Sequence, residues 1–325
     1  MANDKRLVFI LGTPRSGTSW AVKTFDLLPT VCALFEPDVP RRYDSPWREQ
    51  ISSYWSAEPF VITPDTATAE AQQLAKPVFQ HLDHVIEQEA KREHDTVVIK
   101  IPRLEKMPLL LDHYRPDFVY FMHRNPFAIL NSNERFGMLK RIKSTINLEF
   151  DQMQRHAPEF GINLDFARAQ TLPQKHALIT HVRHQLAPTL LQPYSNRIVE
   201  YEDLCFDSAD RYRELFTEAG LGWSETVGEE IRKRGQPAEV GASFHSVQRV
   251  SEERAHGWRN ELSPEIVDSV AAMFADLGIE DNTPPLTPEE RSRASAFHAT
   301  RTKRLKQERV LKSLHHVRLR LTGKR

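Results

Sequence analysis

The sequence predicts an α/β protein with a three-layer fold, in which a central, mostly parallel sheet is flanked by helices. The first observation is a continuous apolar run, residues 7–11, that ends at Gly12 and is typical of a strand buried on both faces. The second is that similar runs recur at residues 96–101, 118–122 and 197–201. The third is that helix-like stretches separate these runs, and such alternation favours right-handed crossovers in a parallel sheet.

The expected helices follow the expected strands or show helical periodicity. They cover residues 17–28, 67–92, 126–136, 174–191, 208–219 and 264–277. Residues 37–64 are rich in proline, tryptophan and tyrosine and show no clear period, which predicts a long ordered loop or lid.

One domain is expected to cover residues 1–285, with a helical insertion at about residues 138–192. The chain of 325 residues is long enough to form a core without disulfides or metals. Residues 286–325 are predicted to form a basic helical tail. Two interpretations of this tail stay open: a solvated terminal helix, and peripheral contact with an anionic membrane surface or a sulfated product.

Composition limits the partners and the compartment. Lys plus Arg and Asp plus Glu each number 44, so no nucleic-acid partner is expected. Cys32 and Cys205 are too few for a disulfide framework, and no Cys/His spacing predicts a metal site. The first apolar run is too short for a signal peptide or a membrane span, so we expect a cytoplasmic protein. Two pairs of histidines on expected helices are interpreted as ordinary surface or lining residues: His81 with His84, and His181 with His184.

Residues 12–20, Gly-Thr-Pro-Arg-Ser-Gly-Thr-Ser-Trp, lie between the first expected strand and the first expected helix. At such a junction, backbone N–H groups and the helix N-terminus form an anion cradle. A nucleotide triphosphatase has a lysine after the second glycine, but Thr18 follows Gly17 here and Arg15 is the cation. Phosphoryl transfer usually needs magnesium beside that lysine, whereas cations alone can handle a sulfuryl group.

A second anion anchor is predicted after the expected strand at residues 118–122. Arg124 follows that strand, at the sheet edge where ligands of open α/β sheets bind. A helix is expected to begin at Pro126, and Ser132 lies about two helical turns after Arg124. Both side chains can then reach one phosphate, for which an arginine fork is well suited.

These two motifs resemble those of the sulfotransferases that use 3′-phosphoadenosine 5′-phosphosulfate (PAPS). Residues 13–20 are similar to the family's 5′-phosphosulfate loop, in the Pro-Arg-Ser-Gly-Thr variant typical of the carbohydrate and tyrosyl-protein branches. Arg124-Asn125-Pro126 followed by Ser132 is similar to the family's 3′-phosphate motif. The resemblance implies a P-loop-like fold, PAPS as sulfuryl donor, adenosine 3′,5′-bisphosphate as product, and no metal.

The same resemblance assigns roles within the loop. Arg15 would contact the 5′-phosphate, and Trp20 would stack on adenine, although a tryptophan on a helix is also typical of a core. The neighbouring residues would bind the phosphate through backbone and hydroxyl groups, so that the predicted loop contacts are Thr13, Pro14, Arg15, Ser16, Gly17, Thr18, Ser19 and Trp20.

Sulfuryl transfer needs a base for the acceptor proton and positive charge beside the leaving oxygen. Glu36 follows Leu34-Phe35, which is interpreted as the end of a further expected strand, and it resembles the base of the carbohydrate and tyrosyl-protein branches. The segment Lys-Ile-Pro-Arg that begins at Lys100 stands where the cytosolic small-molecule branch has Lys-Thr-His, so Lys100 with Arg15 would stabilise the leaving oxygen. The alternative for Glu36 is a structural ion pair with Arg15 or another cation. The alternative for Lys100 is an ordinary surface lysine.

Residues 251–260 resemble the family's late loop, which closes over the 3′-phosphate and adenine. Trp258 matches the tryptophan of that loop. Arg249, Arg254 and Arg259 stay open as the residue that contacts the phosphate, because the family's usual basic triplet is not at its usual offset.

The predicted function is therefore sulfuryl transfer from PAPS to a hydroxyl or amine of a small-molecule or glycan acceptor. The glutamate base favours a carbohydrate, glycolipid or other natural product, by resemblance. Two other classes stay open: a nucleotide kinase or triphosphatase with residues 12–19 as a degenerate P-loop, and a non-catalytic nucleotide-binding module.

Overall fold

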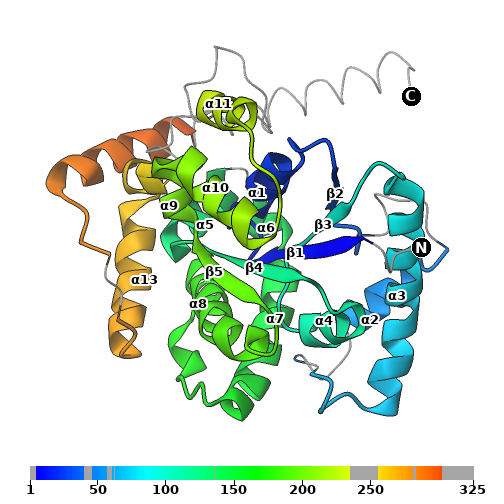
Figure 1. Ribbon diagram of the computed structural model, residues 1–325. Coiled ribbons are helices and arrows are strands. Elements are labelled where there is room, and N and C mark those ends of the chain that lie inside the picture. The colour runs from blue at the N-terminus through cyan, green and yellow to red at the C-terminus, as the bar shows by residue number, and fades with distance from the viewer. Residues whose placement is uncertain are drawn as a thin grey trace, which may run out of the picture.

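A five-stranded parallel sheet forms the centre of the protein (Figure 1). The computed structural model describes residues 5–39, 46–56, 61, 63–135, 137–234, 255–280 and 283–301. The strands are β1 (Arg6–Gly12), β2 (Val31–Phe35), β3 (Thr96–Ile101), β4 (Phe118–His123) and β5 (Asn196–Glu200), in the order β2-β3-β1-β4-β5. The predicted fold class is confirmed, and the carboxyl ends of all five strands meet at one edge.

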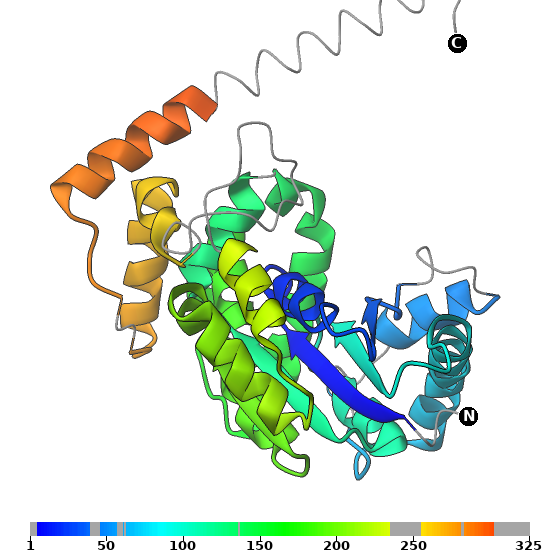
Figure 2. The same ribbon diagram turned by 45° about the horizontal axis from the view of Figure 1, so that its top comes forward.

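Helices cover both faces of the sheet, as Figure 2 shows. Within β1, Phe9 and Leu11 belong to one buried apolar cluster and Val8 and Ile10 to the other, and all four are 0 % exposed. This alternation follows from the two-residue period of a strand, and it explains why β1 is apolar without interruption.

The larger cluster joins the sheet to helices on one face: α3 (Ala69–Glu89), α4 (Met107–Tyr114), α5 (Pro126–Arg135), α7 (Lys143–His156), α8 (Leu172–Leu191) and α13 (Pro264–Asp276). The second cluster joins the sheet to α1 (Thr18–Phe25), α9 (Tyr201–Phe206), α10 (Ser208–Glu218) and α11 (Glu225–Arg234) on the other face. Among the described residues, no helix combines the length and the hydrophobicity needed to cross a bilayer.

Three helices differ from the sequence expectation. The predicted lid contains α2 (Arg48–Ser56), and α4 and α11 were not expected. Tertiary contacts explain α2, because its Ile51 and Tyr54 are fully buried and the Tyr54 hydroxyl donates to the Lys106 carbonyl at 3.0 Å. Helices of eight to ten residues carry too few periodic positions to be recognised reliably from the pattern alone.

The predicted insertion is helical, with α6 (Met138–Arg141), α7, two short 3-10 segments (Ala157–Phe160 and Phe166–Arg168) and α8. A buried ion-pair network joins it to the rest of the domain. Arg183 of α8 donates through Nε to Glu105, ahead of α4, and its Nη2 lies 3.1 Å from Glu149 of α7. Because both ends of this arginine are paired, its charge is compensated within the interior.

Residues 288–301, the part of the predicted tail that the structure describes beyond its first residues, form a helix. Arg291 forms two hydrogen bonds to Asp268 of α13, at 2.8 and 2.7 Å. The first part of the predicted tail is therefore attached to the domain by a paired fork rather than being solvated on all sides.

His176 of α8 predicts a specific acid sensitivity. Burial, with the nearby Arg183 charge, lowers the pKa of His176 to about 4. The unfolded chain takes up this proton below about pH 6.5 while the folded protein stays neutral, so stability is lost as the pH falls from about 6.5 towards 4. His176 Nε2 pairs with Asn133 Nδ2 at 3.1 Å, and a glutamine can supply that acceptor. The free energy of unfolding falls as the pH is lowered, and we expect His176→Gln to remove up to roughly 3 kcal/mol of that decrease.

Urea unfolding at a series of pH values from 7.5 to 4 measures this effect. The exposed His113, changed to glutamine, is the control and should leave the pH profile unaltered. A pH profile of His176→Gln that matches the unsubstituted protein would contradict the assignment.

Candidate active site

Two glycines shape the loop between β1 and α1. Gly12 has φ 151° and Gly17 has φ 99°. A Cβ atom on Gly12 would lie 2.6 Å from Ser16 Oγ and 2.9 Å from the Met122 carbonyl oxygen. A Cβ atom on Gly17 would lie 2.1 Å from the Tyr201 ring. Both positions therefore need glycine, for backbone conformation and for space.

Two hydroxyl groups in this loop are buried without a partner. Thr13 and Ser16 are both 0 % exposed, and within the described part of the chain Thr13 Oγ1 and Ser16 Oγ have no hydrogen-bond partner. Buried hydroxyls are normally paired. Helix α1 begins beside them, at Gly17, without a side-chain cap. The loop thus offers hydroxyl and backbone donors at a helix N-terminus, which suits an anion.

The structure brings the two predicted anion anchors into contact. Arg15 Nε donates to Ser132 Oγ at 2.9 Å, and Arg124 Nη1 donates to the Arg15 carbonyl at 2.7 Å. Arg15 has φ 77°, a conformation that is uncommon for a residue with a side chain. Residues from β1, β4 and α5 therefore form one cationic group at the sheet edge.

Tyr201 supports this group, and its role was missed from the sequence, where it was only the last residue of an expected strand. The guanidinium carbon of Arg124 lies 4.3 Å over the Tyr201 ring, and the same ring limits the space beside Gly17. Tyr201 follows β5 directly. The available signal was an aromatic residue at the carboxyl end of a strand, which would have placed it at the ligand edge.

Glu36 and Lys100 form an ion pair at the ends of the neighbouring strands β2 and β3. Lys100 is 4 % exposed, and its Nζ donates to Glu36 Oε1 and, at 2.8 Å, to Ser19 Oγ. The Glu36 backbone N–H donates to the Lys100 carbonyl at 2.9 Å, and Glu36 has φ 51°. The surface-lysine alternative for Lys100 is therefore wrong, and the cation paired with Glu36 is Lys100 rather than Arg15.

Trp20 lies in the core, as in the second of its two interpretations from the sequence. It is 6 % exposed, and it packs edge-on against Tyr201 and Tyr212 with ring centroids 5.8 and 5.4 Å away. Little of either ring face is open, because the apolar surroundings of α1 on its sheet face bury most of the indole. Trp20 therefore has a packing role, and its stacking on adenine stays a prediction.

Trp258 and Arg259, both predicted to bind the nucleotide, also serve packing. Trp258 is 4 % exposed and stacks on Phe127 at 5.0 Å. Arg259 donates to Glu290 from Nε at 2.5 Å and from Nη2 at 2.8 Å, and to the carbonyls of Pro284 and Pro285 at 2.9 Å. Its fork is thus occupied by a carboxylate from a distant segment. Arg249 and Arg254 lie outside the described residues.

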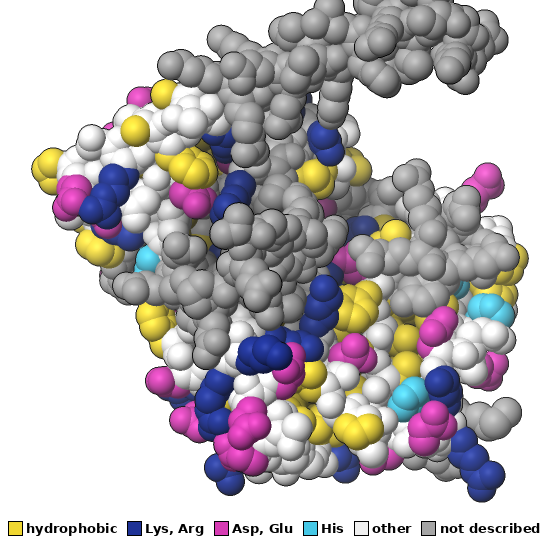
Figure 3. Space-filling view, turned by 90° about the horizontal axis from the view of Figure 1, so that it is seen from above, with side chains coloured by type: hydrophobic (Ala, Val, Ile, Leu, Met, Phe, Trp, Pro, Cys, Tyr) yellow, Lys and Arg dark blue, Asp and Glu magenta, His cyan; other side chains and the backbone are white. Residues whose placement is uncertain are grey.

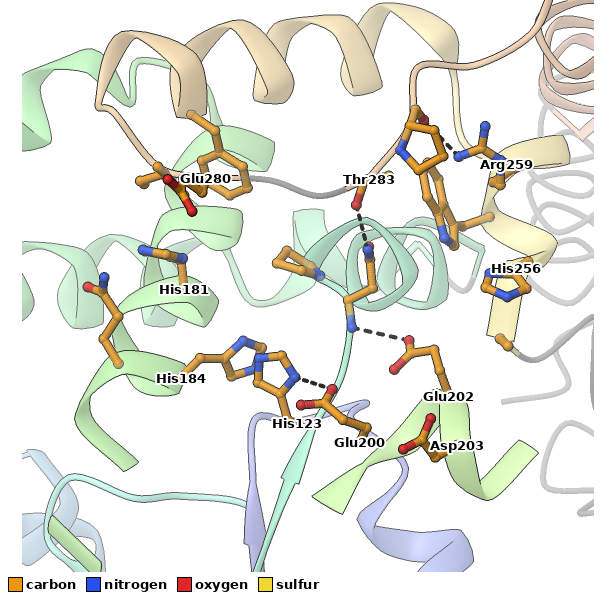
Figure 4. A pocket seen from close by; sticks show the side chains of 18 residues that line it. His123, His181, His184, Glu200, Glu202, Asp203, His256, Arg259, Glu280 and Thr283 are labelled. Atoms are coloured by element: carbon orange, nitrogen blue, oxygen red, sulfur yellow. Dashed lines mark hydrogen bonds and ion pairs between the residues drawn. The ribbon is translucent and has the colours of Figure 1, made fainter. Parts of the chain in front are cut away.

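A cavity of about 840 Å³ lies beyond the carboxyl ends of β4 and β5 (Figure 4). Its ionisable lining comprises His123, His181, His184, Glu200, Glu202, Asp203, His256, Arg259 and Glu280. His123 Nδ1 lies 2.5 Å from Glu200 Oε2, and burial lowers the pKa of His184 and raises that of Glu202. No group of His, Cys, Asp or Glu in the described segments is arranged to hold a metal ion.

Charge on the surface is mixed rather than segregated. On the face in Figure 3, the described Lys and Arg side chains lie among Asp and Glu side chains. This pattern agrees with the equal numbers of basic and acidic residues in the chain. The cations at the site act locally, through the contacts described above.

Comparison with known proteins also indicates a similarity to sulfotransferases. No protein-family model matches the chain. Carbohydrate sulfotransferase 5 of Mus musculus is 25% identical over 302 residues, which span 78% of this chain and 75% of that protein. This similarity confirms the predicted resemblance to the sulfotransferases, near the carbohydrate branch, and the predicted enzyme class.

Two solved structures are similar at lower identity. The sulfotransferase domain from the Synechococcus PCC 7002 olefin synthase has a TM-score of 0.44 and 16% identity, covering 86% of this chain and 97% of that one. Mouse sulfotransferase SULT7A1 complexed with PAP has a TM-score of 0.40 and 12% identity, covering 86% of each chain.

Gly17→Ala is expected to lower the free energy of unfolding by roughly 2 to 4 kcal/mol, because the new methyl group meets the Tyr201 ring in a left-handed conformation. It should also weaken binding of adenosine 3′,5′-bisphosphate at least about tenfold, since the loop must move. Urea unfolding and calorimetric titration measure the two effects.

Gly161→Ala is the matched control, because Gly161 also has positive φ, 76°, but has open space at its Cβ position. We expect it to cost about 1 kcal/mol without any change in nucleotide affinity. Equal effects of the two substitutions would show that the contact with Tyr201 is unimportant.

Proposed function

We propose that this protein is a sulfotransferase that moves a sulfuryl group from PAPS to a hydroxyl, or an amine, of a carbohydrate, glycolipid or related natural product. The observation that carries the proposal is the contact between two cationic anchors at the same sheet edge as an ion pair between a carboxylate and a buried lysine. The anchors are Arg15 and Arg124, joined through the Arg15 carbonyl, and the pair is Glu36 with Lys100.

The loop after β1 fits the phosphosulfate end of the donor. The unpartnered hydroxyls of Thr13 and Ser16, with the N-terminus of α1, supply donors for phosphate oxygens. Arg15 adds positive charge from an exposed position at the loop tip. Because both hydroxyls are buried, the loop opens in this proposal as the phosphate binds, and the two hydroxyls then gain the partners that they lack among the described residues.

The 3′-phosphate of the donor is assigned to Arg124 and Ser132. Ser132 accepts a hydrogen bond from Arg15, and Arg124 is held over the Tyr201 ring. In this proposal the bound nucleotide replaces the Arg15–Ser132 contact, so that Arg15 turns to the 5′ side while Ser132 and Arg124 serve the 3′ side. Arginine forks suit doubly charged phosphates.

In the transfer step, a bond forms between the acceptor oxygen and sulfur while the bond between sulfur and the bridging oxygen breaks. The acceptor proton goes to the Glu36 carboxylate, and the electron pair of the broken bond stays on the bridging oxygen of adenosine 3′,5′-bisphosphate. Lys100, with Arg15, stabilises the charge that develops there.

The ion pair with Glu36 gives Lys100 a second function. Its Nζ contacts both Glu36 and Ser19, so in this proposal it turns from the carboxylate to the bridging oxygen when the donor binds. Glu36 is then free to accept the acceptor proton at the moment when negative charge appears on the donor. Such preorganised charges contribute more inside a protein than in water.

Arg124→Ala is expected to weaken binding of adenosine 3′,5′-bisphosphate about 10- to 100-fold, because a charge-assisted hydrogen bond to the 3′-phosphate is lost. Binding of AMP should fall only a few-fold, through the lost contact with the Arg15 carbonyl. Calorimetry with both ligands measures the difference, and Arg135→Ala, which removes another partly buried arginine at the end of α5, serves as control. Equal losses for both nucleotides would remove Arg124 from the 3′-phosphate site.

Glu36→Gln is expected to lower kcat by about 100- to 10,000-fold, since an amide cannot take the acceptor proton. The affinity for adenosine 3′,5′-bisphosphate should be retained, because Glu36 faces the acceptor. Transfer from radiolabelled PAPS and nucleotide titration measure the two quantities, and the exposed Glu70, changed to glutamine, is the control. Undiminished turnover would exclude Glu36 as base, and magnesium-dependent ATP turnover instead of sulfuryl transfer would favour a kinase or triphosphatase.

A further inference from the structure

A second cation–carboxylate pair lies beside Glu36 and Lys100. Asp38 is two residues beyond Glu36, Arg103 is three residues beyond Lys100, and Arg103 Nε donates to Asp38 Oδ2 at 3.2 Å. The Asp38 side chain is 1% exposed, whereas that of Arg103 is 37% exposed. A buried carboxylate therefore holds a partly open guanidinium next to the proposed base.

Arg103 is fixed from two directions. Its guanidinium carbon lies 4.6 Å over the ring of Trp55 in α2, and Asp38 holds its Nε. In the described part of the chain, its two terminal nitrogens have no further partner. The end of the fork, with two parallel N–H donors, is thus available for a planar or tetrahedral anion. An arginine held by stacking and by one hydrogen bond loses little freedom when it binds.

The segment that carries Asp38 is itself held in place. The Pro37 carbonyl lies 2.6 Å from Nε2 of the buried His81, and the Val39 N–H donates to the Glu36 carbonyl at 2.9 Å. Burial raises the pKa of Asp38 even though the Arg103 charge opposes this effect. The ionised form of Asp38 therefore lowers the free energy of unfolding at neutral pH. A contribution to stability does not account for the Asp38–Arg103 pair.

Strand order decides which substrate can meet Arg103. The donor anchors Arg15 and Arg124 follow β1 and β4, whereas Glu36 and Arg103 follow β2 and β3 on the other side of β1. In an in-line transfer the acceptor approaches sulfur from the side opposite the leaving nucleotide, which here is the side of β2 and β3. Arg103 follows β3 and so lies on the acceptor's side.

We propose that Arg103 is a specificity residue that receives a carboxylate or sulfate group of the acceptor, and that Asp38 and Trp55 are positioning residues for its guanidinium. The inference rests on the proposed function and narrows it to acceptors that carry a negative group near the reacting hydroxyl. Such a group gains a two-point contact with the fork, which a neutral acceptor cannot make.

The test uses a hexuronate-containing oligosaccharide and the same oligosaccharide after carboxyl reduction, with radiolabelled PAPS and the 325-residue protein. We expect kcat/KM at least about tenfold higher for the charged acceptor. In Arg103→Gln this preference should disappear through a rise in KM of about tenfold or more, with kcat and bisphosphate affinity little changed. Arg232→Gln, which removes an exposed arginine of α11, should keep the preference.

Asp38→Asn separates positioning from stability. We expect a higher KM for the charged acceptor, together with an unfolding free energy no lower than that of the unsubstituted protein, because a buried charge has been removed. A purely structural role would lower the unfolding free energy and leave the ratio of the two acceptors unchanged, which would contradict the positioning role.

The outcomes distinguish the two proposals. Transfer to both acceptors at equal efficiency, or a preference that survives in Arg103→Gln, would overturn the role of Arg103 and leave the proposed function standing. Absence of sulfuryl transfer to any hydroxyl or amine acceptor, in a protein that still binds adenosine 3′,5′-bisphosphate, would overturn both.

Discussion

The burial of the Lys100 charge is the constraint on which the rest of the site depends. A lysine that is 4 % exposed needs compensation, because an unpaired charge in the interior is strongly unfavourable. Glu36 and Ser19 supply it, from the end of β2 and from the first turn of α1. One side chain therefore ties β2, β3 and the phosphate loop together. The same contact puts the proposed base, the leaving-group cation and the donor loop within reach of one another.

Backbone strain is concentrated at the same place. Among the described residues, three with side chains have positive φ: Arg15, Glu36 and Arg115. Two of them are proposed to act in transfer, and each is held by contacts from other elements of the fold. Arg15 is held by Ser132 and Arg124, and Glu36 by the backbone and side chain of Lys100. Strain of this kind persists only where the surroundings hold it, and it preorganises the groups concerned.

Two parts of the same sheet edge are proposed to bind the two substrates. The β1–β4 side offers arginines, hydroxyls and a helix N-terminus for a bisphosphorylated nucleotide, and the β2–β3 side offers Glu36 and the Arg103 fork for the acceptor. Lys100 lies at the boundary, where the bond to sulfur is broken in the proposed reaction. The parallel direction of all five strands makes this arrangement possible, because each strand delivers the residue that follows it to the same edge.

The sequence by itself determined the backbone plan: apolar runs for strands, glycines where the loop has no room for a Cβ atom, and polar residues directly after strands. For that reason the fold class could be predicted, together with the position of Arg15, Arg124, Glu36 and Lys100 at the carboxyl ends of strands. The partner of each side chain was decided only by tertiary structure. Arg259 pairs with Glu290, 31 residues away, and the ring of Trp20 in α1 meets Tyr201 of α9 and Tyr212 of α10. Local sequence patterns determine where strands, helices and tight turns lie along the chain. Burial and charge pairing depend instead on segments that only folding brings together.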